Sequence, residues 1–157
     1  MTDRHVATEW ITHLLTALAA KRPARFAGIG LLVYTSQDLP VTPLVQDVTD
    51  LRLPTRNRDE ALALLSTISR YDSRFHDGFH LVDGNTLRVT HVSQFFSPPI
   101  PSDLSDLGST RGVGARYMAA YLGSLMKGVA LTAILSGDEG GLVFDRGEVT
   151  CVVDAGT

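Results

Sequence analysis

The amino-acid sequence predicts an α/β fold in which helices flank a mixed central β-sheet, built as a single domain over residues 1–157. Segments with helical spacing of apolar residues alternate with short apolar runs in the first half of the chain. Hairpin signals, pairs of strand-like runs around tight turns, dominate the second half. Alternating helices and strands favour parallel neighbours, whereas hairpins are antiparallel, so one sheet should contain both kinds of pairing. A length of 157 residues fits one domain.

Three segments have the features of helices. Apolar residues recur at helical spacing near the N-terminus and predict an amphipathic helix over about residues 5–21, which Pro23 ends. A second helix is expected over about 57–71, where Asn57 begins a capping pattern. The third segment, Tyr117 to Lys127, follows a glycine-rich loop.

Strands are expected where short apolar or alternating runs lie between turn residues. The turn Asp83-Gly84-Asn85 joins two of them as a hairpin, and Arg146-Gly147 joins the last two. The stretch around Pro40 and Pro43 is irregular or an edge strand, and the stretch 45–53 is a strand or a loop. The expected strands cover residues 28–34, 79–82, 87–91, 129–135, 142–144 and 148–153.

Composition and charge exclude several classes of protein. The net charge of −3 gives no basis for nonspecific nucleic-acid binding, so we expect no nucleic-acid partner. No apolar run approaches the ~18–20 residues that a membrane span requires, so we expect no membrane association. Cys151 is the only cysteine, which rules out an internal disulfide and favours a cytoplasmic location.

The stretch from Gly108 to Ala120 has the features of an anion site. It combines glycines with Arg111 and Arg116 and leads directly into a helix. Glycines allow close backbone approach, a helix N-terminus presents free N–H groups, and arginine offers donors that match phosphate. The stretch therefore favours a phosphorylated ligand, although glycine loops also open helices that bind nothing.

Three separated motifs follow one another within about residues 60–150. They are Asp77-Gly78-Phe79, then Gly114-Ala115-Arg116-Tyr117-Met118-Ala119-Ala120, then an apolar strand ending in Ser136-Gly137-Asp138-Glu139-Gly140. This ordered set resembles the diadenylate cyclase domain, also called the DNA-integrity-scanning N-terminal domain. The resemblance implies a mixed sheet flanked by helices and a site for ATP. It also implies that two domains meet face to face, with Mg²⁺ or Mn²⁺, to make cyclic di-AMP from two ATP.

The resemblance assigns roles to the matching residues. Asp77 occupies the position of the family's aspartate that is associated with the metal and the 3′-hydroxyl, so it is the expected catalytic residue. Arg116 matches an arginine that handles phosphates. The expected nucleotide-binding residues are Gly78, Phe79, Gly114, Arg116, Tyr117 and Ser136, and the expected metal ligands are Asp77 and Asp138.

The chain departs from the family's pattern mainly at chemical positions. Phe79 replaces a small alanine and would crowd or reshape the nucleotide pocket. Tyr117 replaces a histidine, and a tyrosine hydroxyl with a pKa near ~10 is a poor substitute for imidazole at neutral pH. Gly137 replaces an acidic residue, for which Asp138 or Glu139 would have to substitute.

These observations lead to three hypotheses. The favoured one is a degenerate module that binds an adenine nucleotide, ATP or cyclic di-AMP, and senses it without turning it over well. The alternative is an active diadenylate cyclase that uses Mg²⁺ or Mn²⁺ held by Asp77 with Asp138 or Glu139. The third is a structural or oligomerisation domain that keeps only the fold. A homodimer or homo-oligomer is an open alternative for the oligomeric state.

Overall fold

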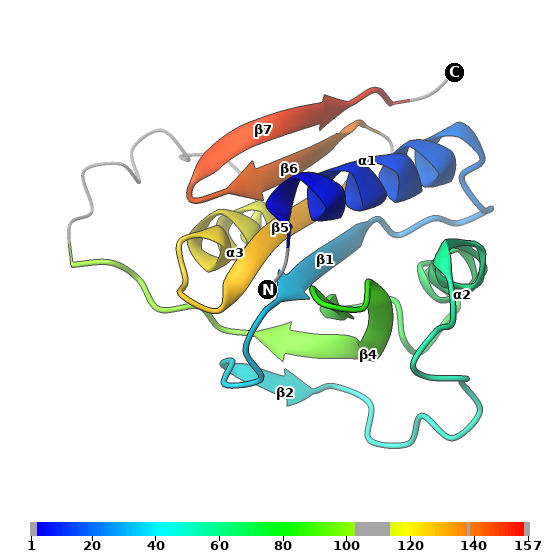
Figure 1. The fold of residues 1–157 in the computed structure, drawn as a ribbon. Coiled ribbons are helices and arrows are strands. Elements are labelled where there is room, and N and C mark those ends of the chain that lie inside the picture. Colours follow the sequence, from blue (N-terminus) through cyan, green and yellow to red (C-terminus); the bar gives the residue numbers. More distant parts are fainter. Residues whose placement is uncertain (1–2, 103–113, 138, 156–157) are drawn as a thin grey trace.

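The structure, a computed structural model, describes residues 3–102, 114–137 and 139–155. Along the chain its elements are α1 (Arg4–Ala20), β1 (Ile29–Tyr34), β2 (Val41–Pro43), α2 (Arg58–Ile68), β3 (Phe79–Asp83), β4 (Arg88–Phe96), α3 (Ala115–Ser124), β5 (Val129–Leu135), β6 (Gly141–Asp145) and β7 (Glu148–Val153). In the described residues, seven strands form one sheet in the order β2-β4-β3-β1-β5-β6-β7 (Figure 1). The predicted α/β fold with a mixed, helix-flanked sheet is confirmed.

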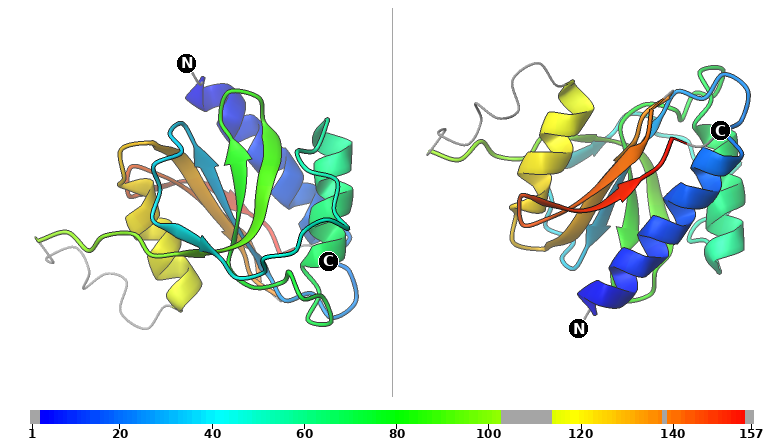
Figure 2. Two further views of the ribbon diagram at one scale, coloured as in Figure 1. Left: turned by 90° about the horizontal axis from the view of Figure 1, so that it is seen from below. Right: turned by 90° about the horizontal axis from the view of Figure 1, so that it is seen from above.

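The helices lie on both faces of the sheet (Figure 2). On one face, α1 and α2 bury Leu15 and Leu65 against Leu31 of the sheet. On the other face, α3 buries Ala120 against a second cluster that includes Phe144. Strand β1 lies between these two cores and all six of its residues are buried, which explains why it is a continuous apolar run.

The directions of the strands determine which loops meet. Strand β1 pairs with β3 in parallel and with β5 in antiparallel orientation. The residues that precede β1, the residues that precede β3 and the residues that follow β5 therefore lie at one edge of the sheet. Those segments contain Gly28, Asp77 and Ser136.

Local chemistry explains where the helices begin. The side chain of Asn57 accepts a hydrogen bond from the Glu60 N–H at 2.9 Å, which confirms the predicted cap of α2. The side chain of Asp3 caps α1 in the same way by accepting from the His5 and Val6 N–H groups. Helix α3 has Gly114 at its N-cap, and no side chain of the described residues caps its first N–H groups.

Several boundaries differ from those expected. Two open alternatives are decided: the stretch around Pro43 is the edge strand β2, as one alternative expected, and 45–53 contains no strand. The strand expected over 87–91 continues to Phe96, because β4 pairs with β3 on one side and β2 on the other. Helix α2 ends at Ile68 and α3 at Ser124, each three residues before its expected end.

None of the helices in the described part of the chain has the length and hydropathy needed to cross a membrane.

Candidate functional site

The guanidinium of Arg116 lies against the bare backbone of Gly28 at the edge where β1, β3 and β5 bring their loops together. Arg116 is the second residue of α3, and its Nη1 donates to the Ala27 carbonyl at 3.2 Å. Gly28 has a φ of +84°, and a Cβ there would lie 2.6 Å from Nη1 and 2.9 Å from the Leu135 carbonyl oxygen. Only glycine allows this contact without displacing the arginine.

Arg116 is a partly buried cation with few protein partners. Among the described residues its side chain has one hydrogen bond, to Ala27, and no ion pair. Burial lowers the pKa of its guanidinium, while the nearby Asp77 and Tyr71 raise it. Asp77 is therefore within electrostatic reach of Arg116, and most of the guanidinium donors have no partner among the described residues.

A cavity of about 510 Å³ opens beside Arg116, between the start of α3 and the turn that follows β5. It brings together four of the predicted nucleotide-binding residues, Gly114, Arg116, Tyr117 and Ser136. The other residues that line it are Ile134, Leu135, Glu139, Gly140 and Leu142. The cavity thus combines a cation and a hydroxyl with an apolar wall, which is the usual composition of a small-molecule site.

Tyr117 forms part of that wall. Its half-buried ring meets the ring of Phe144 edge to face, with centroids 5.2 Å apart. Phe144 is fully buried in the core below α3 and so fixes the orientation of the tyrosine. Tyr117 therefore both packs against the core and faces the cavity.

An arginine that sequence reasoning did not identify holds the opposite wall. Arg22 follows α1, and its guanidinium donates to the carbonyl oxygens of Ser136, Glu139 and Ala155. Within the turn, the Ser136 hydroxyl accepts from the Glu139 N–H at 2.9 Å. No sequence signal connects Arg22 to this turn, because 114 residues separate it from Ser136.

Asp77 and Gly78 do not line the cavity. Asp77 is exposed, and its Oδ1 accepts from the Gly78 N–H at 2.9 Å. Gly78 has a φ of +80°, and a Cβ there would lie 2.6 Å from the Gln94 carbonyl oxygen. The backbone geometry therefore requires glycine at position 78. Of these two residues, only Asp77 has a side chain that is able to bind a ligand.

Phe79 lies in the core instead of facing the cavity. Its side chain is 4% exposed, packs over Gly30 and meets the Phe96 ring with centroids 5.4 Å apart. A Cβ on Gly30 would come within 2.9 Å of the Phe79 ring. Phe79 thus fills space in the core cluster below α3.

His80 lies near Arg116 and, like Arg22, was not among the predicted site residues. Its ring is fully buried, and burial together with the Arg116 charge lowers its pKa to about 3. The imidazole is therefore neutral at physiological pH. Its Nδ1 accepts the Ser93 N–H at 3.0 Å, which places the proton on Nε2.

The residues that would hold a divalent metal are only partly within the described chain. Asp138 lies outside it. Among the described residues, no three His, Cys, Asp or Glu side chains gather as a metal site. Asp77 and Glu139 are exposed carboxylates, and Mg²⁺ commonly takes one or two carboxylates together with phosphate oxygens and water. A metal that arrives with a nucleotide would find the Glu139 carboxylate in the lining of the cavity and the Asp77 carboxylate outside that lining.

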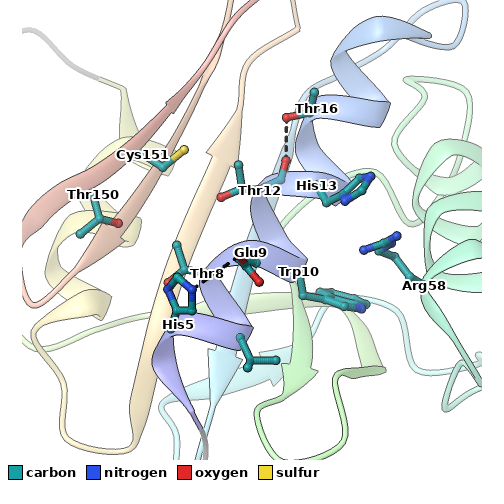
Figure 3. A pocket seen from close by; sticks show the side chains of 11 residues that line it. His5, Thr8, Glu9, Trp10, Thr12, His13, Thr16, Arg58, Thr150 and Cys151 are labelled. Atoms are coloured by element: carbon teal, nitrogen blue, oxygen red, sulfur yellow. Dashed lines mark hydrogen bonds and ion pairs between the residues drawn. The ribbon is translucent and has the colours of Figure 1, made fainter.

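A larger hollow of about 760 Å³ lies between α1 and β7, away from this site (Figure 3). It is lined by His5, Val6, Thr8, Glu9, Trp10, Thr12, His13, Thr16, Arg58, Thr150 and Cys151. The hollow contains none of the predicted site residues. It is shallow and open, and its imidazole of His5 pairs with the exposed carboxylate of Glu9 at 3.5 Å.

Comparison with known proteins gives a likeness of fold. The sequence matches no protein-family model and no curated protein. A hypothetical membrane spanning protein from Bacillus cereus superposes with a TM-score of 0.64 and 16% identity over 94% of this chain, which spans 63% of that structure. DacA from Staphylococcus aureus, a diadenylate cyclase, superposes with a TM-score of 0.54 and 15% identity, over 92% of this chain and 85% of DacA. The α/β fold is thus shared, at a distance, with a diadenylate cyclase.

Proposed function

We propose that this chain binds an adenine nucleotide in the cavity beside Arg116 and acts as a degenerate, diadenylate-cyclase-like binding module. The observation that carries the proposal is the placement of Arg116 against Gly28. The guanidinium is partly buried at the start of a helix, has one hydrogen bond to described residues and borders a cavity. The distant fold likeness to DacA supports a nucleotide over other anionic ligands.

An anion at this position would offset two unfavourable features. A cation near the N-terminus of a helix opposes the helix dipole, and burial of the Arg116 guanidinium lowers its pKa. A phosphate would pair with the guanidinium and accept from the uncapped N–H groups of α3. We therefore propose that the nucleotide phosphates lie between the guanidinium of Arg116 and the N–H groups at the N-terminus of α3.

The apolar part of the cavity suits the base. Tyr117 presents a ring that is held by Phe144, and Ile134 and Leu142 complete the wall. Stacking of a base on an aromatic side chain contributes about 1–3 kcal/mol. Ser136 and Glu139 line the same cavity, where their hydroxyl and carboxylate would contact the ribose or phosphates.

The proposed loss of turnover follows from the residues that surround the phosphates. Tyr117 stands where an imidazole is expected, and Gly137 where a carboxylate is expected. Loss of one catalytic donor typically costs ~10²–10³ in rate. Asp77 would hold Mg²⁺ or Mn²⁺ beside the phosphates, and a bound metal of this kind supplies charge stabilisation and activates a hydroxyl. Arg116 binds the phosphates and Tyr117 orients the base, so binding persists when turnover does not.

The test is a titration of the purified chain with ATP in the presence of Mn²⁺. We expect ATP at 100 times its dissociation constant to stabilise the folded state by about 2.7 kcal/mol, read as a rise in melting temperature. Arg116→Ala should weaken binding by roughly 10–100-fold, because a charged hydrogen bond contributes about 1.5–3 kcal/mol. Arg88→Ala, which removes an exposed arginine at the far end of β4, is the charge-matched control and should bind normally.

Product analysis separates the proposal from its alternatives. Incubation with ATP and Mn²⁺ or Mg²⁺ should yield no metal-dependent cyclic di-AMP above background. Clear formation of that product would make the chain an active diadenylate cyclase. If neither ATP nor cyclic di-AMP raises the melting temperature at millimolar concentration, the chain keeps only the fold and the binding proposal is wrong.

A further inference from the structure

Strand β4 contains a bulge directly beside the Asp77-Gly78 corner. Phe79 pairs with Gln94 and Leu81 pairs with His91, so His80 faces the two residues Val92 and Ser93 of β4. Ser93 is fully buried and has a φ of +52°, a left-handed backbone conformation that non-glycine residues rarely adopt.

The imidazole of His80 completes the bulge. A bulge leaves a backbone N–H without a partner on the neighbouring strand. Here the Ser93 N–H donates to His80 Nδ1 at 3.0 Å, so a side chain replaces the strand carbonyl. The His80 ring is fully buried, and its Nε2 has no hydrogen-bond partner among the described residues.

The side chain of Ser93 contacts the main chain of Asp77. Its hydroxyl donates to the Asp77 carbonyl oxygen at 2.9 Å. The carbonyl oxygen of the adjacent Gln94 approaches Gly78 so closely that a Cβ there would lie 2.6 Å away. The main chain on both sides of the Asp77 carboxylate is thus held by the bulge.

This arrangement lowers the stability of the fold, and packing of the strand alone does not require it. A buried imidazole with a nitrogen unpaired within the described part of the chain and a left-handed serine both oppose folding. Two apolar residues in regular β pairing would avoid both penalties. Strained backbone of this kind persists where the surrounding structure fixes it and is concentrated at functional sites.

We infer that Ser93 and His80 are positioning residues for Asp77: together they hold the backbone from which its carboxylate reaches a metal ion bound with the nucleotide. The inference rests on the proposed function. Ser93 acts directly on the Asp77 main chain, and His80 acts through Ser93. Neither residue touches the ligand.

The experiment measures the affinity for ATP twice, once in the presence of Mn²⁺ and once in EDTA. Both measurements are made on the wild-type chain and on the Ser93→Gly variant. Glycine accepts the left-handed backbone and removes only the hydroxyl. Because residues that support a metal ligand typically change metal affinity by 10–100-fold, we expect the gain in ATP affinity that Mn²⁺ provides to fall about tenfold or more. Affinity in EDTA, which depends on Arg116, should stay within about twofold of wild type.

Two further variants keep the test decisive. His80→Phe removes the acceptor of the Ser93 N–H while keeping a ring, and it should lower the same metal-dependent gain. Ser124→Gly is the matched control, because it removes a buried hydroxyl that donates to a backbone carbonyl, that of Tyr121, at the far end of α3. If Ser93→Gly does not fold, Ser93→Cys provides a nearly isosteric residue with a weaker donor.

The outcomes are distinct. A wild-type chain that binds no ATP overturns the proposed function and this inference together. A wild-type chain whose ATP affinity gains from Mn²⁺, with Ser93→Gly gaining equally, overturns the positioning role alone. A Ser93→Gly variant that loses thermal stability but keeps the full metal-dependent gain also overturns it, because the bulge then serves only the fold.

Discussion

At the scale of single residues, the candidate site depends on positions where one atom decides the geometry. A Cβ at position 28 would collide with the Arg116 side chain, and a Cβ at position 78 would collide with the Gln94 carbonyl oxygen. Both positions have positive φ values, of +84° and +80°. The sequence motif included Gly78, whereas Gly28 looked like the first residue of an ordinary strand. Its importance comes from an arginine that is distant in the sequence.

Gly28→Ala should therefore disrupt the site. Strain from the left-handed backbone and the clash with Arg116 Nη1 should lower the free energy of unfolding by roughly 1–3 kcal/mol and abolish ATP-dependent stabilisation. Gly128→Ala is the control: its φ is +95°, a Cβ there would meet only Ser36, and it lies at the opposite end of β5. Thermal melts of both variants should show a lowered melting temperature in each. The rise in melting temperature caused by ATP should be lost in Gly28→Ala alone.

His80 predicts a pH dependence of stability. Its pKa in the folded chain is lowered to about 3 by burial and by Arg116, so the unfolded chain takes up a proton below about pH 6.5 that the folded chain does not. The stability contributed by neutral His80 is thus complete above about pH 6.5 and is lost as the pH falls towards 3. The expected slope from this residue is up to about 1.4 kcal/mol per pH unit.

Urea unfolding of wild type and His80→Phe between pH 7 and pH 4 measures this slope. The wild-type chain should lose stability more steeply on acidification than the variant does. His13→Gln, which changes an exposed histidine of α1, should follow wild type. Parallel pH profiles for wild type and His80→Phe would contradict a neutral buried imidazole.

At the scale of elements, the cavity lies between one helix and one turn, and separate parts of the chain hold each of them. Helix α3 is held from below by Phe144 and by the Thr132 hydroxyl, which donates to the Ala120 carbonyl oxygen at 2.6 Å. The turn after β5 is held by Arg22, which connects it to the end of α1 and to the chain after β7. The site thus depends on α1 even though no residue of α1 lines it.

Arg22→Ala should loosen this turn without unfolding the protein. Three backbone carbonyls lose their donor, so amide hydrogen exchange in residues 136–140 should accelerate by about tenfold or more, while β1 and β3 remain protected. Lys21→Ala, at the neighbouring exposed position, is the control. Equal protection of the turn in both variants would show that Arg22 does not hold it.

At the scale of the whole molecule, one sheet carries two cores. Leu15 of α1 is buried on one face and Phe79 of β3 on the other, and β1 contributes to both cores. Since the cores share their strands, we expect one cooperative unfolding transition, as a single domain requires.

Leu15→Ala and Phe79→Ala test this unit. Each should lower the free energy of unfolding by about 2–5 kcal/mol, because each removes a buried side chain and leaves a cavity. Both should retain one transition when the melt is followed by circular dichroism and by the fluorescence of Trp10. Two separate transitions in either variant would contradict the single-domain prediction.

The order and type of the helices, and of the strands other than β2, followed from the sequence alone. Helical periodicity, capping residues such as Asn57 and turns such as Asp83-Gly84-Asn85 are local signals, and each acts within a few residues of where it is read. The mixed character of the sheet followed as well, because helix–strand alternation and hairpins impose different pairings. The ordered motifs also pointed to the fold that the chain shares distantly with DacA.

Only the tertiary structure decided which side chains meet. The contact of Arg116 with Ala27 joins residues 89 apart, and the hold of Arg22 on Ser136 joins residues 114 apart. It also decided that Phe79 lies in the core and that Ser93 and His80 hold the backbone of Asp77. Contacts of this kind depend on the strand order and on a bulge in β4. No local pattern specifies them, because the energy that selects them comes from packing the whole sheet between its helices.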